Sequence, residues 1–467
     1  MHSSKHMIHE GYDKIKTFYL ALAHSAIIAA YSIVRPMKTT VFISFVGVSY
    51  VPTAKIVSFI MAPVLMFLYS VILNATHKNK VATIFFGIYA VAIAIFSMLF
   101  IHPTIGLENT FASCSRIFGW IFYLFLDFFN VLILETFWAF ANSISSPHFA
   151  KEKYSIISAA ARATGIAAPL LACYLIDMLK PLVSFPLLCI MASILLTVAL
   201  VGLQRITSNV PEDYLAGYSR DHEAHENNPK KKSGWLDGLK LLFKEPYVLG
   251  IFVLIYSFNY VSTFADFQMQ ALAAATFSGP AAIAKFYYIY TAIFQVLGFF
   301  FAFVGTNALL RRFGLPFCLM VSPFITFGSL LVLLNFKSLT VATVTMVIFR
   351  ALNYGFNVPV REMLFIPTTE TIQFKSKAWI TSFGQTLAES LSSFFNDPSM
   401  AAHLFSRSIT TSSAFTSTVQ LLGQARPAVA LLLSGGWFAT AYLLGNKYQE
   451  TIAHNKVIGR RAPKKDL

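Results

Sequence analysis

Apolar runs of about 20 residues recur along almost the whole of this chain, and they constrain its fold more than any other feature. Such a run lets an α-helix cross a bilayer, where every backbone polar group must be paired inside the chain. Of the 467 residues, 56% are hydrophobic and only 12% are charged, whereas soluble domains carry about 25% charged residues. The short alternating segments of a membrane β-barrel are absent. The sequence therefore predicts an all-α membrane protein.

The apolar runs predict about twelve transmembrane helices in two halves of six. The first half covers 17–203 and the second 246–445, with a polar linker at 204–245 and tails at 1–16 and 446–467. Two six-helix halves around a central linker are typical of major-facilitator transporters, whose cargo binds between repeats near the bilayer midplane. The expected spans are 17–47, 53–74, 81–101, 117–141, 155–177 and one ending near 203, then 246–275, 282–305, 315–335, 339–359, 378–396 and 427–445.

The formal charge of +15 falls mostly in short loops and tails, on alternate sides of the predicted spans. This distribution follows the positive-inside rule, so it indicates a multi-pass protein of the cell (inner) membrane with both termini in the cytoplasm. The same distribution explains the positive charge without a nucleic-acid partner. Within the linker, Trp235, Leu236 and Leu239 predict a short amphipathic helix on the membrane surface.

Two cations, Arg35 and Lys38, lie inside the first apolar run. A charged side chain at the bilayer centre costs about 2.5–3.5 kcal/mol on insertion scales, so it is expected to face the protein interior. Their spacing of three places both on one helix face. Two fixed positive charges on a cavity wall suit an anion, above all a phosphate. The alternative is that they reach the membrane interface or pair with buried acids.

Further charged and polar residues lie in the predicted spans. Arg350 is a third candidate for phosphates, and Asn259 is a candidate for the rest of a nucleotide. The embedded acids Asp127 and Asp266 either balance the cations or carry protons. Lys375 and Lys377 precede the eleventh span, where they bind cargo or only set the orientation of the chain.

The motifs of enzymes and metal sites are absent. No GxxxxGK[ST] loop is present, so we expect no ATP hydrolysis, no enzymatic activity and no cofactor. The four cysteines are widely spaced and predict neither a disulfide framework nor a metal site.

Several motifs resemble the nucleotide transporters of intracellular bacteria and plastids, the ADP/ATP translocase family. They are Tyr31-Ser-Ile-Val-Arg35-Pro-Met-Lys38, Tyr50-Val-Pro-Thr-Ala-Lys55, Phe137-Trp138-Ala-Phe-Ala-Asn142 and Phe365-Ile-Pro-Thr-Thr369 with the lysines after it. These motifs come from both halves of the chain. The resemblance implies a major-facilitator-type fold and the exchange of ATP for ADP.

The resemblance also implies residue roles. Arg35 and Lys38 match the family's basic pair, Asp127 matches its acid in the fourth helix with Glu135 as a rival, and Lys375 and Lys377 match its basic residues before the eleventh helix. In the seventh helix the chain departs from the family, because Asp266 is displaced and no Trp-Lys follows it.

Three functions are compatible with these observations. The first is a monomeric ATP/ADP antiporter working by alternating access. The second is a proton-coupled transporter of another small organic anion on the same fold. The third is a membrane scaffold or sensor that does not transport.

Overall fold

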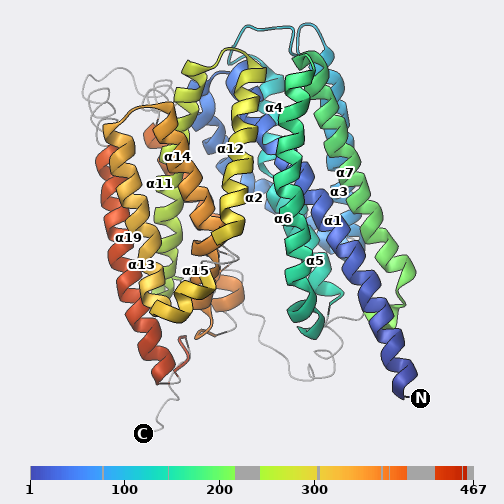
Figure 1. Ribbon diagram of the computed structural model, residues 1–467, viewed down its shortest axis with the longest axis vertical. Helices are drawn as coiled ribbons and strands as arrows, with labels where there is room; N and C mark the ends of the chain where they lie inside the picture. Colours follow the sequence, from blue (N-terminus) through green and yellow to red (C-terminus); the bar gives the residue numbers. More distant parts are fainter. Residues whose placement is uncertain are drawn as a thin grey trace. The chain divides into compact units, whose positions relative to one another are not determined.

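The computed structural model describes residues 2–75, 78–145, 147–215, 242–301, 306–369, 372–377, 379–396, 426–454 and 456–459. Within these ranges the regular structure is helical, apart from one isolated bridge between Thr368 and Ile458. Figure 1 shows long helices running alongside one another within each part of the chain. The all-α prediction is confirmed.

Six spans of the first half are present. They are α1 (His2–Phe45), α2 (Val51–Ala75), α3 (Lys78–Ile101), a composite of α4 (Ile117–Asp127), the π turn η2 (Asn130–Leu134) and α5 (Glu135–Ser143), then α6 (Pro147–Met178) and α7 (Pro181–Asn209).

The second half repeats this arrangement after the linker. Its helices are α11 (Pro246–Thr276), α12 (Pro280–Phe300), α13 (Thr306–Asn335), a composite of α14 (Leu339–Leu352), the π turn η4 (Asn353–Asn357) and α15 (Val358–Glu362), the π turn η7 (Trp379–Gly384) with α16 (Gln385–Asn396), and α19 (Arg426–Ala453).

Eleven helices of the described ranges are long and apolar enough to cross a membrane. The expected span at 378–396 is not among them. Its helix is divided into η7 and the 12-residue α16, and the buried residues of α16 include Ser390, Ser392 and Ser393.

Several predicted boundaries differ from the structure. The helix α1 begins at His2, so it includes most of the expected tail at 1–16, and it continues through Pro36. The last helix, α19, continues to Ala453 rather than ending near 445. The predicted surface helix of the linker lies largely outside the described residues.

The chain forms two compact units. Unit 1 consists of 1–48, 60–230 and 277–295, and unit 2 consists of 49–59, 231–276 and 296–467. Each unit therefore contains one short segment from the other half of the sequence, the first turns of α2 in unit 2 and most of α12 in unit 1.

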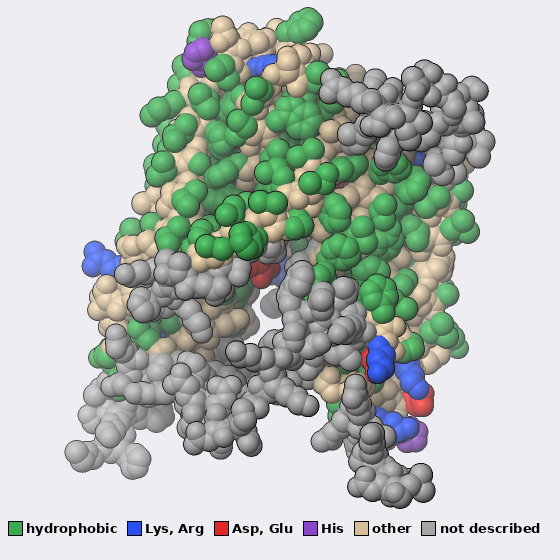
Figure 2. All heavy atoms as spheres, turned by 180° about the vertical axis from the view of Figure 1, so that it is seen from behind, with side chains coloured by type: hydrophobic (Ala, Val, Ile, Leu, Met, Phe, Trp, Pro, Cys, Tyr) green, Lys and Arg blue, Asp and Glu red, His purple; other side chains and the backbone are tan. Residues whose placement is uncertain are grey.

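In unit 1, α1 packs against α4, α6 and α7, and α3 packs against α7. Edge-to-face phenylalanine rings join α3 to α4 and α7, with Phe100 5.2 Å from Phe122 and 5.9 Å from Phe185 between ring centroids. The other face of α3 exposes Ile88, Val91, Ile95 and Met98 at helical spacing, as membrane spans do. In the coloured part of Figure 2, hydrophobic side chains are likewise spread over much of the face, whereas few charged ones are visible.

Arg116 fastens the loop that precedes α4. Its guanidinium donates to the carbonyl oxygens of Ile105, Gly106 and Asn109 at 2.7–2.9 Å and lies 3.7 Å from the centre of the Phe45 ring. Burial lowers the pKa of Arg116, but an arginine remains protonated in proteins. The loop is therefore held by charge-assisted hydrogen bonds at the end of α1.

In unit 2, α11 packs against α14, α16 and α19, and α13 packs against α19. Gly445 of α19 makes this last contact possible, because a Cβ at this position would lie 2.7 Å from the backbone of Pro316. Small residues permit such close approach between membrane helices.

We expect Gly445→Val to destabilise unit 2 by about 1–3 kcal/mol, the typical free-energy penalty for overpacking. The measurement is the thermal unfolding temperature of the detergent-solubilised protein. Gly436→Val is the matched control, because Gly436 lies on the same helix with nothing within 4 Å of its added Cβ. Equal unfolding temperatures for the two variants would contradict this packing.

Candidate substrate-binding site

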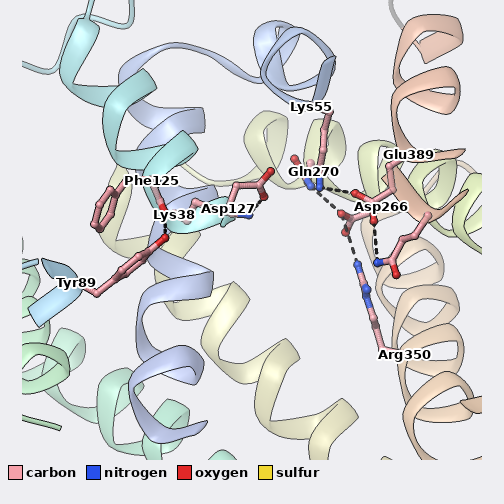
Figure 3. Close-up of polar contacts among 10 residues, drawn as sticks. Lys38, Lys55, Tyr89, Phe125, Asp127, Asp266, Gln270, Arg350 and Glu389 are labelled. Carbon is pink, nitrogen blue, oxygen red and sulfur yellow. Dashed lines mark hydrogen bonds and ion pairs between the residues drawn. The ribbon is translucent and has the colours of Figure 1, made fainter. Parts of the chain in front are cut away.

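Unit 1 contains an ion pair between its first and fourth spans. Lys38 Nζ of α1 donates to Asp127 Oδ1 at the end of α4, at 2.6 Å (Figure 3). The side chains are only 12% and 15% exposed, so the pair is poorly solvated. Removing one partner of a buried pair costs about 3–5 kcal/mol, because the other charge is left uncompensated.

Aromatic rings surround the cations of α1. Lys38 Nζ lies 4.7 Å from the centre of the Tyr123 ring, and the Arg35 guanidinium lies 5.6 Å from the Tyr31 ring. Tyr31 in turn stacks on Phe129, with 5.5 Å between the ring centroids. Arg35 and Lys38 thus share one aromatic-lined face, as their spacing predicts.

That face is the one side of α1 that its neighbours leave partly open. From residue 26 to residue 38 every side chain is buried except at four positions, which are Ile28, Tyr31, Arg35 and Lys38. The spacing of three, four and three defines a single stripe along the helix. Within residues 26–38 of α1 the cations therefore lie on an accessible stripe of an otherwise buried segment.

Unit 2 contains the corresponding ion pair with its charges reversed. Asp266 of α11 lies 3.9 Å from Arg350 of α14 between Oδ2 and Nη2, and it also accepts a hydrogen bond from Gln270 Nε2 at 3.0 Å (Figure 3). The Asp266–Arg350 pair is looser than the Lys38–Asp127 pair.

The stripe on α1 is repeated on α11. From residue 254 to residue 266 every side chain is buried except those of Tyr256, Asn259, Thr263 and Asp266, which follow the same spacing. In this repeat Asp266 takes the place of Lys38, and Asn259 takes the place of Tyr31. The Asn259 amide donates to the Ile255 carbonyl oxygen at 2.8 Å.

The π turns complete the repeat. In both units a π turn begins at an asparagine three residues after the charged residue of the fourth span, at Asn130 after Asp127 and at Asn353 after Arg350. π turns inside α-helices occur frequently at functional sites. The π turns were not predicted from the sequence, where the shared pattern Asp127-Phe-Phe-Asn130 and Arg350-Ala-Leu-Asn353 marks their positions.

The remaining candidates lie elsewhere in their units. Lys377 pairs with Glu362 at the end of α15, and its amine lies 5.4 Å from the centre of the Phe365 ring. Lys375 belongs to the π turn at Ile372–Ser376, and its side chain is outside the described part. Between the rival acids of the fourth span, Asp127 is the partner of Lys38, whereas Glu135 is exposed at the start of α5.

The fold is of the major-facilitator type. The chain is similar to a bacterial homologue of the iron transporter ferroportin in an inward-facing state, at a TM-score of 0.58 and 15% identity over 91% of this chain and 98% of that one. It is similar to the nucleoside transporter NupG, at a TM-score of 0.54 and 12% identity over 92% of this chain and 98% of that one. It is also similar to the major-facilitator proton:xylose symporter XylE, at a TM-score of 0.52 and 14% identity over 92% of this chain and 96% of that one. At these identities the likeness shows the fold alone.

The sequence family is more specific than the fold. The family model of the TLC ATP/ADP transporters matches residues 8–431, so the chain belongs to the TLC ATP/ADP transporter family and is a membrane nucleotide transporter. No curated protein matches the chain in sequence. The resemblance found in the sequence motifs is thereby confirmed, together with transport as the function.

Proposed function

We propose that this transporter exchanges ATP for ADP, and that Arg35, Lys38 and Arg350 bind the phosphates. The observation that carries the proposal is the Lys38–Asp127 ion pair on the open stripe of α1. The carboxylate of Asp127 keeps the poorly solvated Lys38 charged. A phosphate of the cargo can replace this carboxylate as the anion bound to Lys38. Arginine and lysine bind phosphate through charge-assisted hydrogen bonds.

Exchange follows if the ion pair prevents the carrier from changing conformation without cargo. Asp127 bonds Lys38 and so ties α4 to α1. A bound phosphate takes over Lys38 and releases Asp127, so α4 becomes free to move at its π turn. Only the loaded carrier then changes conformation, and one nucleotide leaves for each that enters.

The nucleoside part of the cargo would lie along the same stripes. Tyr31 of α1 and Tyr256 of α11 present rings on these stripes, and Asn259 presents an amide at the position equivalent to Tyr31. A purine can stack on an aromatic ring and hydrogen-bond to an amide. In this proposal ATP crosses intact, the transporter works as a monomer in the cell membrane with both termini cytoplasmic, and Lys375 and Lys377 guide anions toward the site.

The test is the uptake of labelled ATP by intact bacterial cells that express the chain. Excess ADP should abolish saturable uptake, whereas AMP and inorganic phosphate should compete weakly because they carry fewer phosphate charges. Uptake that excess ADP does not reduce, by protein shown to be in the membrane, would contradict the proposal.

A second candidate is proton-coupled transport of another organic anion. This candidate rests on Asp266, which lies 3.9 Å from Arg350 and accepts a hydrogen bond from the neutral Gln270. Uptake driven by an inward proton gradient, and unaffected by ADP, would favour it.

A further inference from the structure

After the last span the chain turns back and runs beside residues 365–369, one of the motifs shared with the family. The Ile458 amide donates to the Pro367 carbonyl oxygen at 2.8 Å, and the Ile458 carbonyl oxygen accepts from the Thr369 amide at 3.1 Å. These two hydrogen bonds form the isolated parallel bridge of the described residues. We call residues 456–459 the C-terminal strap, because they join the end of α19 to the turn that follows α15.

The strap has one side chain toward the protein and the next one away from it. Ile458 is half-buried and packs against the apolar core of unit 2, which includes Phe365 and Ile372. Val457, directly before it, is 41% exposed. This alternation is typical of an extended segment with one face buried. Apolar packing therefore adds to the backbone hydrogen bonds of the strap.

Gly459 permits the close approach of the strap to the turn. Its φ of 88° lies in the left-handed region, which glycine adopts without steric cost. A Cβ at this position would lie 2.6 Å from Ile372 Cδ1 and 3.0 Å from Thr369 Oγ1. A larger residue would therefore strain the backbone and push the strap away from the turn.

The turn beneath the strap is also held from within. Gln373 Nε2 donates to the carbonyl oxygens of Phe365 and Thr368, at 3.1 Å in both cases. The Thr369 carbonyl oxygen accepts from the amides of Ile372 and Gln373, at 2.9 and 3.0 Å. The strap and Gln373 therefore fix the same stretch of backbone from two sides.

This turn leads directly to Lys377. The Lys377 amine pairs with Glu362 and lies 5.4 Å from the centre of the Phe365 ring, so both contacts come from the far side of the turn. The place of Lys377 consequently depends on the shape of the turn between them. A side chain that is already held in place loses less conformational entropy when it binds a phosphate than a mobile one does.

We propose that the C-terminal strap positions Lys377 for an arriving nucleotide by fixing the turn between α15 and the π turn at Ile372–Ser376. Ile458 and Gly459 are positioning residues, because they contact the turn and not the cargo. The inference rests on the proposed exchange of ATP for ADP. The strap continues from α19, which packs against α11 and α13, so the folded core of unit 2 anchors it.

Two neighbouring residues of the strap provide the first test. Ile458→Asp places a charge where the strap packs, so we expect KM for ATP to rise about five-fold or more while kcat stays within about two-fold, the pattern of lost cargo binding. Val457→Asp is the matched control, because it adds the same charge at an exposed position. Ile458→Leu should keep the parental KM. Equal KM values for Ile458→Asp and Val457→Asp, at normal membrane levels, would overturn the proposal.

A second pair of variants tests the fit of Gly459. Gly459→Val should raise KM for ATP with little change in kcat, because the added side chain displaces the strap. Gly279→Val is the control, since Gly279 has a similar φ of 84° and nothing lies within 4 Å of its added Cβ. A parental KM in Gly459→Val, or an equal rise of KM in both variants, would contradict the role of the strap.

Hydrogen exchange of the full-length protein in detergent reports on the strap without transport. The Thr369 amide should exchange about ten-fold faster or more in Ile458→Asp than in the parent, because the local contact that protects it is lost. Val457→Asp should leave the rate unchanged. An unchanged rate in Ile458→Asp would overturn the proposal, whatever the KM.

The two measurements separate this inference from the function on which it rests. If the parent does not exchange ATP for ADP but Ile458→Asp releases the Thr369 amide, the proposed function is wrong and the strap stands. If exchange occurs and the amide is released with KM unchanged, the function stands and the strap does not position Lys377.

Discussion

Replacing Lys38 with alanine is expected to lower ATP uptake by about 100-fold or more. Loss of one partner of a poorly solvated ion pair corresponds to about 3–5 kcal/mol, and each 1.4 kcal/mol is a factor of ten. The variant also loses the charge that the phosphates would bind. Initial uptake rates, normalised to the amount of protein in the membrane, measure the effect. Lys38→Arg should keep part of the activity because it preserves the charge.

A variant of Asp127, the partner of Lys38, distinguishes a role in cargo binding from a merely structural role of the pair. Asp127→Asn keeps Lys38 charged and removes its competitor, so we expect a lower KM together with a lower kcat, because release of cargo becomes slow. A purely structural pair would give the same loss in both variants, without a fall in KM. Lys14→Ala is the control, since it removes an exposed positive charge from the same helix.

Replacing Arg350 with glutamine is expected to lower kcat/KM for ATP by about 10- to 100-fold, mainly through KM. A hydrogen bond to a charged group contributes about 1.5–3 kcal/mol, and the loose 3.9 Å contact with Asp266 leaves the guanidinium able to turn toward a phosphate. Arg350→Lys should recover only part of the loss, because lysine lacks the planar fork.

The control for Arg350 is Arg311→Gln, which removes an exposed arginine at the start of α13. Concentration dependence of uptake is the measurement. An Arg350→Gln variant with unchanged KM and reduced kcat would assign Arg350 to the conformational change instead of to cargo binding.

The helical class and the charged stripe of α1 could be predicted because they depend on local pattern. Apolar length predicts spans, and the spacing of Arg35 and Lys38 predicts a shared face. The need to balance buried charge also predicts that an embedded acid pairs with these cations. The resemblance favoured Asp127 over Glu135, but local pattern alone could not select between these two acids of one span, because the choice depends on tertiary packing and on the π turn between them.

The features that were missed depend on contacts distant in sequence. The ion pairs Lys55–Glu389 and Lys285–Asp177 join residues that are 334 and 108 positions apart, so no spacing rule connects them. The pairing of Lys377 with Glu362 arises only through the turns after α15. The equivalence of the two stripes was also not apparent from the sequence, because Lys38 and Asp266 occupy equivalent positions but carry opposite charges.

Counter-exchange in proteoliposomes is the direct test of nucleotide exchange. Purified transporter is reconstituted into vesicles that are either empty or loaded with ADP, and the entry of labelled ATP is followed. We expect rapid entry into loaded vesicles, efflux of one ADP for each ATP, and little entry into empty vesicles. Equal entry into empty and loaded vesicles would contradict exchange, and with it the role of the Lys38–Asp127 pair in holding the empty carrier in place.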